Sequence, residues 1–497
     1  TVEPYVTVKL YHSGIVLVGT TTADAAGAYS VTSSVLAAGA YSFTVTATDV
    51  AGNLSAASSG PSVTIDTTVA TPGAPDLNAA SDTGSSPTDN LTNDTTPTFN
   101  GTVEPNGTVK LYHSGTVLVG TTIADAVGAY GVTSSALNDG AYTFTVTATD
   151  VAGNLSAASP GLSVTIDTTI TTPGAPDLQA ASDTGSSQTD NLTNDTTPTF
   201  VGTVEPNATI KLYRSGTVLV GTTTADGAGA YSVTSSVLAA GTYGFTVTAT
   251  DVAGNLSAAS SGLSVTIDTT VATPGAPDLQ AASDTGASST DNITNDTTPT
   301  FVGTTEPYAT VKLYHSGTVL VGSTTTDAAG NYSATSSVLT AGTYGFTVTV
   351  TDAAGNVSAA SSGLSVMIDT TIATPGPPDL DAASDTGFSP TDNITNDTTP
   401  TFVGTAEPYA TAKLYHSGTV LVGTATADGA GAYSVTSSVL AAGTYGFTVT
   451  ATDAAGNESA PSSWLSVTID TAVATPGAPD LDAASDTGSS QTDNITN

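Results

Sequence analysis

A chain of 497 residues with 43 Asp and Glu, only 6 Lys and Arg and no Cys has a formal net charge of −37. This charge argues against nucleic acid and anionic membranes as partners, because both bind basic surfaces. The missing cysteines exclude a disulfide scaffold and thiolate chemistry. No apolar run reaches the roughly 18–20 residues that a membrane-spanning helix requires, so no membrane insertion is expected.

The chain is a tandem repeat. The segment TVEPYVTVKLYHSG begins at Thr1 and returns in close copies at Thr102, Thr203, Thr304 and Thr405, so the period is 101 residues without an insertion. A natural boundary follows the motif VTID, where a linker with Thr and Pro begins. The ends of the chain look like cuts through a longer array. The expected domains are a partial one at 1–66 that lacks its first two strands, complete ones at 67–167, 168–268, 269–369 and 370–470, and a partial one at 471–497 with a first strand and its loop.

Within a repeat the hydrophobic period is 2, which is typical of strands. In chain order, residues 67–167 predict strands at APDL, TPTFNGTV, TVKLY, TVLVGTT, AYGVTSSAL, AYTFTVTATD and LSVTID, with a tight hairpin at HSG. About seven short strands in about 100 residues is the size of an immunoglobulin-like sandwich, and Tyr142 stands where the tyrosine corner of that fold would lie. The sequence therefore predicts an all-β tandem array of immunoglobulin-like β-sandwich domains.

Three motifs recur in the repeats: DTTPTFxGTxEP, ATDxAGNxSA and SVTIDTT…PGAPDL. They resemble the bacterial Ig-like repeats of giant secreted surface adhesins and biofilm-associated proteins. The resemblance implies a calcium-stiffened stalk that holds a distal binding domain away from the cell. The sequence departs from such proteins in one respect, because it contains neither a binding tip nor glycine-rich nonapeptide calcium repeats.

A carboxylate-rich segment, SDTGSSPTDNLTNDTTPTF, runs from Ser81 to Phe99 and recurs in every later repeat; we call it the acidic loop. Strand directions place this loop and the terminal Asp of VTID at one end of each domain. They place the Glu of VEP and the Asp and Asn of DVAGN at the other end. In a head-to-tail array these two ends meet, so acidic side chains from both domains should converge at every junction.

Such a cluster repels itself by several kcal/mol as an order-of-magnitude estimate. Each repeat has one Lys, which lies on a strand, and only the third copy adds a second basic residue, Arg214. The ligand types of the cluster fit Ca²⁺, which takes 6–8 oxygens from carboxylates, carbonyls, amides and water. Mg²⁺ demands stricter geometry, and Zn²⁺ prefers His or Cys. The alternative is that these residues form turns and polar surface, above all Asp76 and Asp125. The expected ligands of an inter-domain, structural Ca²⁺ are Asp66, Asp82, Asp89, Asn90, Glu104, Asp150, Asp167, Asp183, Asp190, Glu205, Asp251, Asn255, Asp268, Asp284, Asp291, Glu306, Asp352, Asp369, Glu407 and Asp453.

No catalytic constellation is present: the sequence has no Ser/His/Asp set, phosphate-binding Gly loop or HExxH. His113 is a poor catalytic candidate because the third copy has Arg214 at that position, and its place before Ser-Gly predicts an exposed turn residue. We therefore expect no enzyme.

The leading interpretation is a secreted, cell-surface spacer of a bacterial adhesin, stiffened by calcium and used for attachment or biofilm formation. Its partners would be neighbouring repeats and a host or surface ligand bound by a tip domain outside this sequence. The first alternative is a subunit of a self-assembling filament, sheath or surface layer, with identical chains as partners. The second is a glycan- or receptor-binding module, which predicts an aromatic-lined recess.

Overall fold

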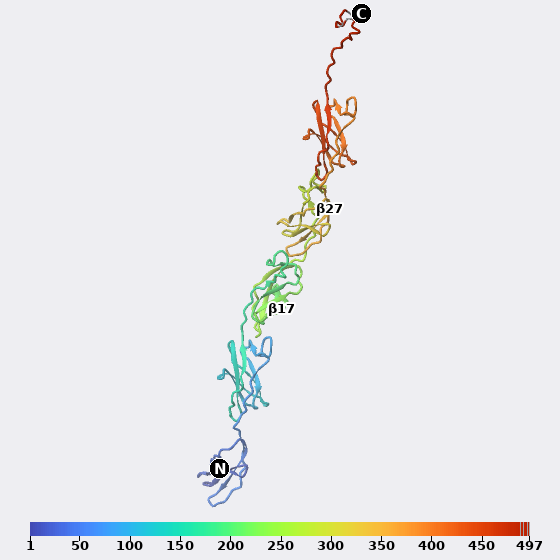
Figure 1. Cartoon of the computed structure of the whole chain (residues 1–497). Helices are drawn as coiled ribbons and strands as arrows, with labels where there is room; N and C mark the ends of the chain where they lie inside the picture. Colours follow the sequence, from blue (N-terminus) through green and yellow to red (C-terminus); the bar gives the residue numbers. More distant parts are fainter. Residues whose placement is uncertain (488, 491, 495, 497) are drawn as a thin grey trace. The chain divides into compact units, whose positions relative to one another are not determined.

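The computed structural model describes residues 1–487, 489–490, 492–494 and 496, and these residues form strands and connecting segments without a helix (Figure 1). No segment of the described chain is a helix that could cross a membrane. The contacts divide the chain into two units: Thr1–Asp183 with Asp195–Ile267, and Thr184–Asn194 with the residues from Asp268 onward.

The strands of the first unit are short, as expected for a sandwich fold. They are β1 (Thr7–His12), β2 (Val16–Thr22), β3 (Gly39–Thr48), β4 (Ser62–Ile65), β5 (Asp76–Leu77), β6 (Leu91–Thr92), β7 (Thr98–Thr102), β8 (Thr108–His113), β9 (Val117–Ile123), β10 (Ala129–Thr133), β11 (Gly140–Thr149), β12 (Leu162–Ile166), β13 (Asp177–Leu178), β15 (Thr199–Thr203), β16 (Thr209–Arg214), β17 (Val218–Thr224), β18 (Ala230–Thr234), β19 (Gly241–Thr250) and β20 (Leu263–Ile267).

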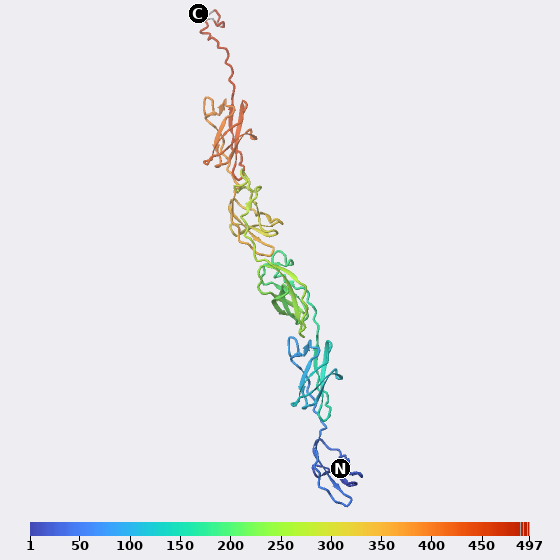
Figure 2. The same cartoon turned by 180° about the vertical axis from the view of Figure 1, so that it is seen from behind.

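The second unit repeats the same pattern. Its strands are β14 (Leu192–Thr193), β21 (Asp278–Leu279), β22 (Ile293–Thr294), β23 (Thr300–Thr304), β24 (Thr310–His315), β25 (Val319–Thr325), β26 (Asn331–Thr335), β27 (Gly342–Thr351), β28 (Leu364–Ile368), β29 (Asp379–Leu380), β30 (Ile394–Thr395), β31 (Thr401–Thr405), β32 (Thr411–His416), β33 (Val420–Thr426), β34 (Ala432–Thr436), β35 (Gly443–Thr452) and β36 (Leu465–Ile469). The view from behind shows the same strand-only architecture (Figure 2).

The repeat at 67–167 folds into two sheets. One has the strand order β10-β7-β5 and the other β6-β12-β11-β8-β9. Every pairing is antiparallel except that of β6, which runs parallel to β12. This is the arrangement of an immunoglobulin-like β-sandwich, so the predicted fold class is confirmed. Each predicted strand is present, and β6, inside the acidic loop, is an addition.

The core lies between the two sheets and is built from one face of each strand. Along β11, Phe144, Val146 and Ala148 are buried while the intervening threonines are half-exposed, as the period of 2 predicts. Phe144 packs against Phe99 of β7 with ring centroids 4.3 Å apart, which joins the two sheets. The equivalent pair recurs in the next repeat at 4.4 Å.

The glycine in β7, Gly101, is required by packing. The ring of Tyr130 on β10 lies directly over Gly101, and a Cβ added there would come within 2.4 Å of the tyrosine oxygen. Burial without a hydrogen-bond partner raises the pKa of the Tyr130 phenol to about 12. The same glycine–tyrosine contact recurs at Gly202 and Tyr231.

Two side-chain hydrogen bonds further stabilise the sandwich of the repeat at 67–167. Tyr142 donates from its hydroxyl to the carbonyl of Asn138, 3.0 Å away, which is the contact that the tyrosine corner predicts. After β11, the chain turns back and Ser156 accepts the amide of Ala148 through its Oγ, 2.9 Å away. The serine hydroxyl therefore takes the place of a backbone carbonyl where the strand pairing is interrupted.

Candidate metal centres at the repeat junctions

Three carboxylates meet where the repeat at 1–66 joins the repeat at 67–167. Asp66 follows β4, Glu104 follows β7, and Asp150 follows β11. One oxygen of each lies within 4.8 Å of the other two. Asp66 is exposed, Glu104 is half-buried and Asp150 is buried. Three chain segments far apart in the sequence thus direct negative charge at one point.

Hydrogen bonds hold these carboxylates in place. Ala70 donates its amide to Glu104 Oε1 at 3.0 Å, so the glutamate fixes the linker. Asn154 donates its side-chain amide to Asp150 Oδ2 at 2.6 Å and to the carbonyl of Asp66 at 3.1 Å. The bond from Asn154 lowers the pKa of Asp150 below its usual value, which keeps this carboxylate ionised.

The same connections recur at the later junctions. Asn255 donates to the carbonyl of Asp167 at 2.9 Å, and the amide of Thr171 donates to Glu205 at 2.8 Å. The other junctions repeat the pattern with Asn356 on the Asp268 carbonyl, Asn457 on the Asp369 carbonyl, Ala272 on Glu306 and Ala373 on Glu407. Asp251, Asp352 and Asp453 hold their asparagines as Asp150 does. Among the described residues, only Asp66, Glu104 and Asp150 form a group of three carboxylates within 4.8 Å.

The donor chemistry of the junction is oxygen alone. Carboxylates and a backbone carbonyl are the ligands that Ca²⁺ accepts with tolerant geometry, whereas Zn²⁺ prefers nitrogen and sulfur. In the part of the chain that the structure describes, the one salt bridge joins Lys413 to Glu458 and includes none of these carboxylates. The residues present therefore fit a hard divalent cation, although the metal assignment of each residue stays a prediction.

The acidic loop lies against the DVAGN loop of the next repeat, as the strand directions predict. The contacting atoms are not the carboxylates, however. Thr83 donates from its hydroxyl to the carbonyl of Ala253 at 2.8 Å, and the amide of Ser85 donates to Val252 at 3.2 Å. The corresponding contacts in the second unit join Thr184 to Ala354 and Thr285 to Ala455, at 2.7 and 2.6 Å.

The predicted ligands of the acidic loop make contacts inside their own repeat. Asp82 is buried and accepts the amide of Asn90 at 3.3 Å, and Asp89 accepts the amide of Leu91 at 3.1 Å. Asn90 has a left-handed backbone, with φ at 60°. The counterparts in later repeats are Asp183, Asp190, Asp284 and Asp291.

Sequence reasoning missed Thr83 as a docking residue. Its signal is present, because a Thr follows the Asp of SDTG in each copy of the acidic loop. A hydroxyl is so common in this Thr-rich chain that the position does not stand out. His113 is also more than a turn residue: it is half-buried and meets the ring of Tyr142 edge-on at 5.0 Å. In the third copy Arg214 stands at this position, and its Cζ lies 5.4 Å from the centroid of the Tyr243 ring. The position therefore serves packing against the tyrosine.

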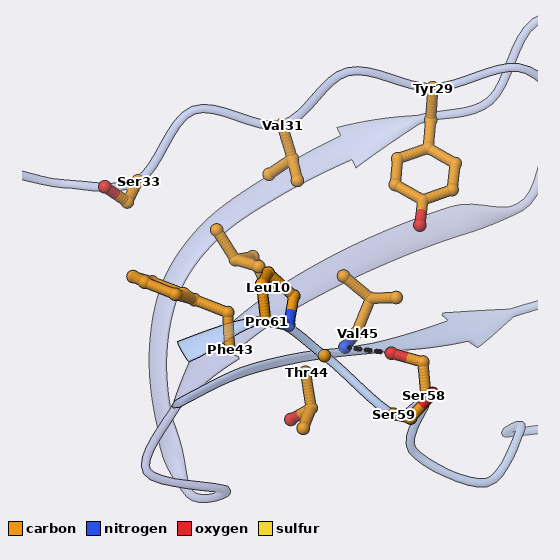
Figure 3. A pocket seen from close by; sticks show the side chains of 11 residues that line it. Leu10, Tyr29, Val31, Ser33, Phe43, Thr44, Val45, Ser58, Ser59 and Pro61 are labelled. Carbon is orange, nitrogen blue, oxygen red and sulfur yellow. Dashed lines mark hydrogen bonds between the residues drawn. The ribbon is translucent and has the colours of Figure 1, made fainter. Parts of the chain in front are cut away.

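An apolar groove of about 390 Å³ opens in the repeat at 1–66, lined by Leu10, Val31 and Phe43 among others (Figure 3). Phe43 corresponds to Phe144, whose partner in the next repeat is Phe99 of β7. The groove thus marks the place that β7 fills in a complete repeat.

Paired sheets, a phenylalanine core and acidic junctions repeated at a fixed interval define a modular array of Ig-like sandwiches. The chain belongs to the bacterial Ig-like domain family, whose pattern matches residues 3–67, 68–168, 169–269, 270–370 and 371–471.

Two curated proteins share part of this array. Exoglucanase B of Cellulomonas fimi is 37% identical over 242 residues, which are 46% of this chain and 20% of that protein. Chitinase A1 of Niallia circulans is 36% identical over 159 residues, which are 31% of this chain and 22% of that protein. The chain therefore spans about one fifth of the length of the curated relatives it matches.

Solved structures with similar folds include bacterial surface proteins. One is described as a Ca²⁺-stabilized adhesin that helps an Antarctic bacterium to reach out and bind ice; it is 23% identical, covers 81% of this chain and 99% of its own, and has a TM-score of 0.30. Another is the BSP domain of a biofilm-associated protein, 13% identical over 82% of this chain and 97% of its own, with a TM-score of 0.17.

Proposed function

We propose that this chain is a spacer in an extracellular bacterial adhesin, and that Ca²⁺ bound at the junctions stiffens it for attachment or biofilm formation. The supporting observation is the junction of Asp66, Glu104 and Asp150, where three carboxylates lie within 4.8 Å of one another. A cation there would join the end of one repeat to two loops of the next. Calcium sites of extracellular modules bind at roughly 10⁻⁴–10⁻³ M, so such a spacer would stiffen outside the cell.

The role assigned to these repeats is mechanical and not catalytic. The curated relatives are named as enzymes, but the match covers about a fifth of each of them. A module that recurs in such different proteins suits a spacing role. The polar side chains described above form turns and junction contacts in each repeat. The binding partner of the whole protein would belong to a domain outside this array.

The absence of native cysteine makes the junction directly testable. Donor and acceptor dyes on Val16→Cys and Val117→Cys would report across the junction that contains Glu104. We expect millimolar calcium to narrow the distribution of energy-transfer efficiency, and magnesium at the same concentration to leave it broad. Glu104→Gln should shift the calcium midpoint to higher concentration, because it removes one of the three charges.

The matched control is Glu205→Gln, the same substitution at the next junction. It should leave the calcium midpoint of the Val16–Val117 pair unchanged. A distribution that ignores calcium up to several millimolar, or that responds equally to both substitutions, would contradict the proposal.

A further inference from the structure

Three acidic loops each bury a carboxylate oxygen that accepts no hydrogen bond. Asp82, Asp284 and Asp385 are 6%, 4% and 5% exposed. The Oδ2 of each accepts an asparagine amide, at 3.3, 3.3 and 3.1 Å. The Oδ1 of each is buried and makes no hydrogen bond. An ionised oxygen withdrawn from water without a partner is unfavourable, so something must compensate it.

A cavity adjoins Asp385 in the last complete repeat. It measures about 340 Å³, and its walls include Asp379, Asp381, Asp385, Thr391 and Asn393. Three of these side chains are carboxylates, and the other two carry further polar oxygen. Such a space is large enough for an ion with several waters.

The first complete repeat has the same electrostatic problem. Burial raises the pKa of Asp82, and the nearby charges of Asp89 and Asp76 raise it further. Asp284 is affected in the same way. The one salt bridge of the described residues, Lys413 with Glu458, does not involve these loops. Either a proton or a cation from solution must therefore offset the charge.

We propose that the acidic loop binds a Ca²⁺ ion inside its own repeat, at Asp82 in the first complete repeat and at Asp385 in the last. This site is separate from the junction of Asp66, Glu104 and Asp150, and it goes beyond the proposed function. The ion takes the free Oδ1 and neighbouring carboxylates, with water in the remaining positions, which is the mixed oxygen coordination that calcium tolerates.

The site has a structural consequence for docking. Thr83 follows Asp82 directly and donates to Ala253 of the next repeat. An ion on Asp82 orders the loop that carries this contact. Metal inside a repeat thus prepares the surface that the next repeat binds.

The repeats differ at one wall of the site. The last complete repeat has Asp381 where the earlier ones have Asn78, Gln179 and Gln280. An extra carboxylate increases calcium affinity, because ligand charge is one of its main determinants. The site at Asp385 is therefore expected to bind calcium most tightly.

Equilibrium dialysis of the full chain against calcium, followed by metal analysis, tests this assignment. The triple variant Asp82→Asn, Asp284→Asn and Asp385→Asn should bind one ion fewer for each substituted loop. A second variant, with Gln in place of Glu104, Glu205, Glu306 and Glu407, should keep these ions. The two variants separate a failure of the loop sites from a failure of the junction sites.

The proposal is overturned if the triple variant stays folded by circular dichroism and binds as many ions as the parent chain. If the triple variant is more stable than the parent chain both with and without calcium, a proton and not a cation satisfied the buried oxygen. This result would also overturn the proposal. If the triple variant unfolds, the variant Asn78→Asp tests the proposal instead. It should tighten calcium binding at its own acidic loop on the order of tenfold. An unchanged binding curve would overturn the proposal.

Discussion

The bond between Asn255 and the carbonyl of Asp167 links two repeats directly, at 2.9 Å. We predict that Asn255→Ala loosens this junction. A neutral hydrogen bond contributes about 1 kcal/mol net, so its loss should shift the balance between docked and open junctions about fivefold. The amide of Thr171, which is bonded to Glu205, reports this opening through hydrogen exchange. Residues 168–174 should exchange about fivefold faster in the variant.

Asn53→Ala is the matched control. Asn53 makes the same two bonds to Asp49, both at 2.7 Å and both within its own repeat. The control should therefore loosen its own loop and leave residues 168–174 unchanged. If residues 168–174 exchange at the parent rate in Asn255→Ala, or equally fast in the control, the amide does not couple the repeats.

Three further predictions concern single repeats. Ser156→Ala should destabilise its repeat by about 1–3 kcal/mol, because the buried amide of Ala148 loses its acceptor; hydrogen exchange along β11 measures this, and unchanged protection would refute it. Gly101→Ala should cost about 1–3 kcal/mol through its clash with Tyr130, seen as a lower melting temperature of that repeat. The raised folded pKa of Asp82 means that its ionisation opposes folding. In chelator, its repeat should therefore gain stability as the pH falls through that raised pKa toward the unfolded value of 3.8, and Asp82→Asn should abolish the gain; an identical pH profile in the variant would contradict this reasoning.

The sheet framework was predictable because its signals are local and repeated. Alternation along Ala141–Asp150 defines the buried face of β11, and the turn residues of HSG define its neighbouring hairpin. Strand directions alone bring Asp66, at the end of one repeat, to the junction with Glu104 and Asp150 of the next repeat. These arguments need only the chain order and the two-residue period.

The remaining features depend on tertiary contacts. The strand β6 is two residues long, and its parallel pairing with β12 leaves no pattern in the sequence. The loop containing Asp82 is polar throughout, so nothing local distinguishes its buried carboxylate from the exposed ones. Strand directions locate a loop at one end of a domain, but they do not decide that Thr83 rather than Asp82 faces the next repeat.

The junction between the repeats at 67–167 and 168–268 is attached at two separate places. The covalent linker after Asp167 is one, and the hydrogen bond from the Thr83 hydroxyl to the carbonyl of Ala253 is the other. A joint pinned at a single point turns freely under torque, whereas one pinned at two points resists rotation and yields only about the line between the pins. If the chain acts as the proposed spacer, shear from flowing liquid would bend this junction in a preferred plane without unwinding it.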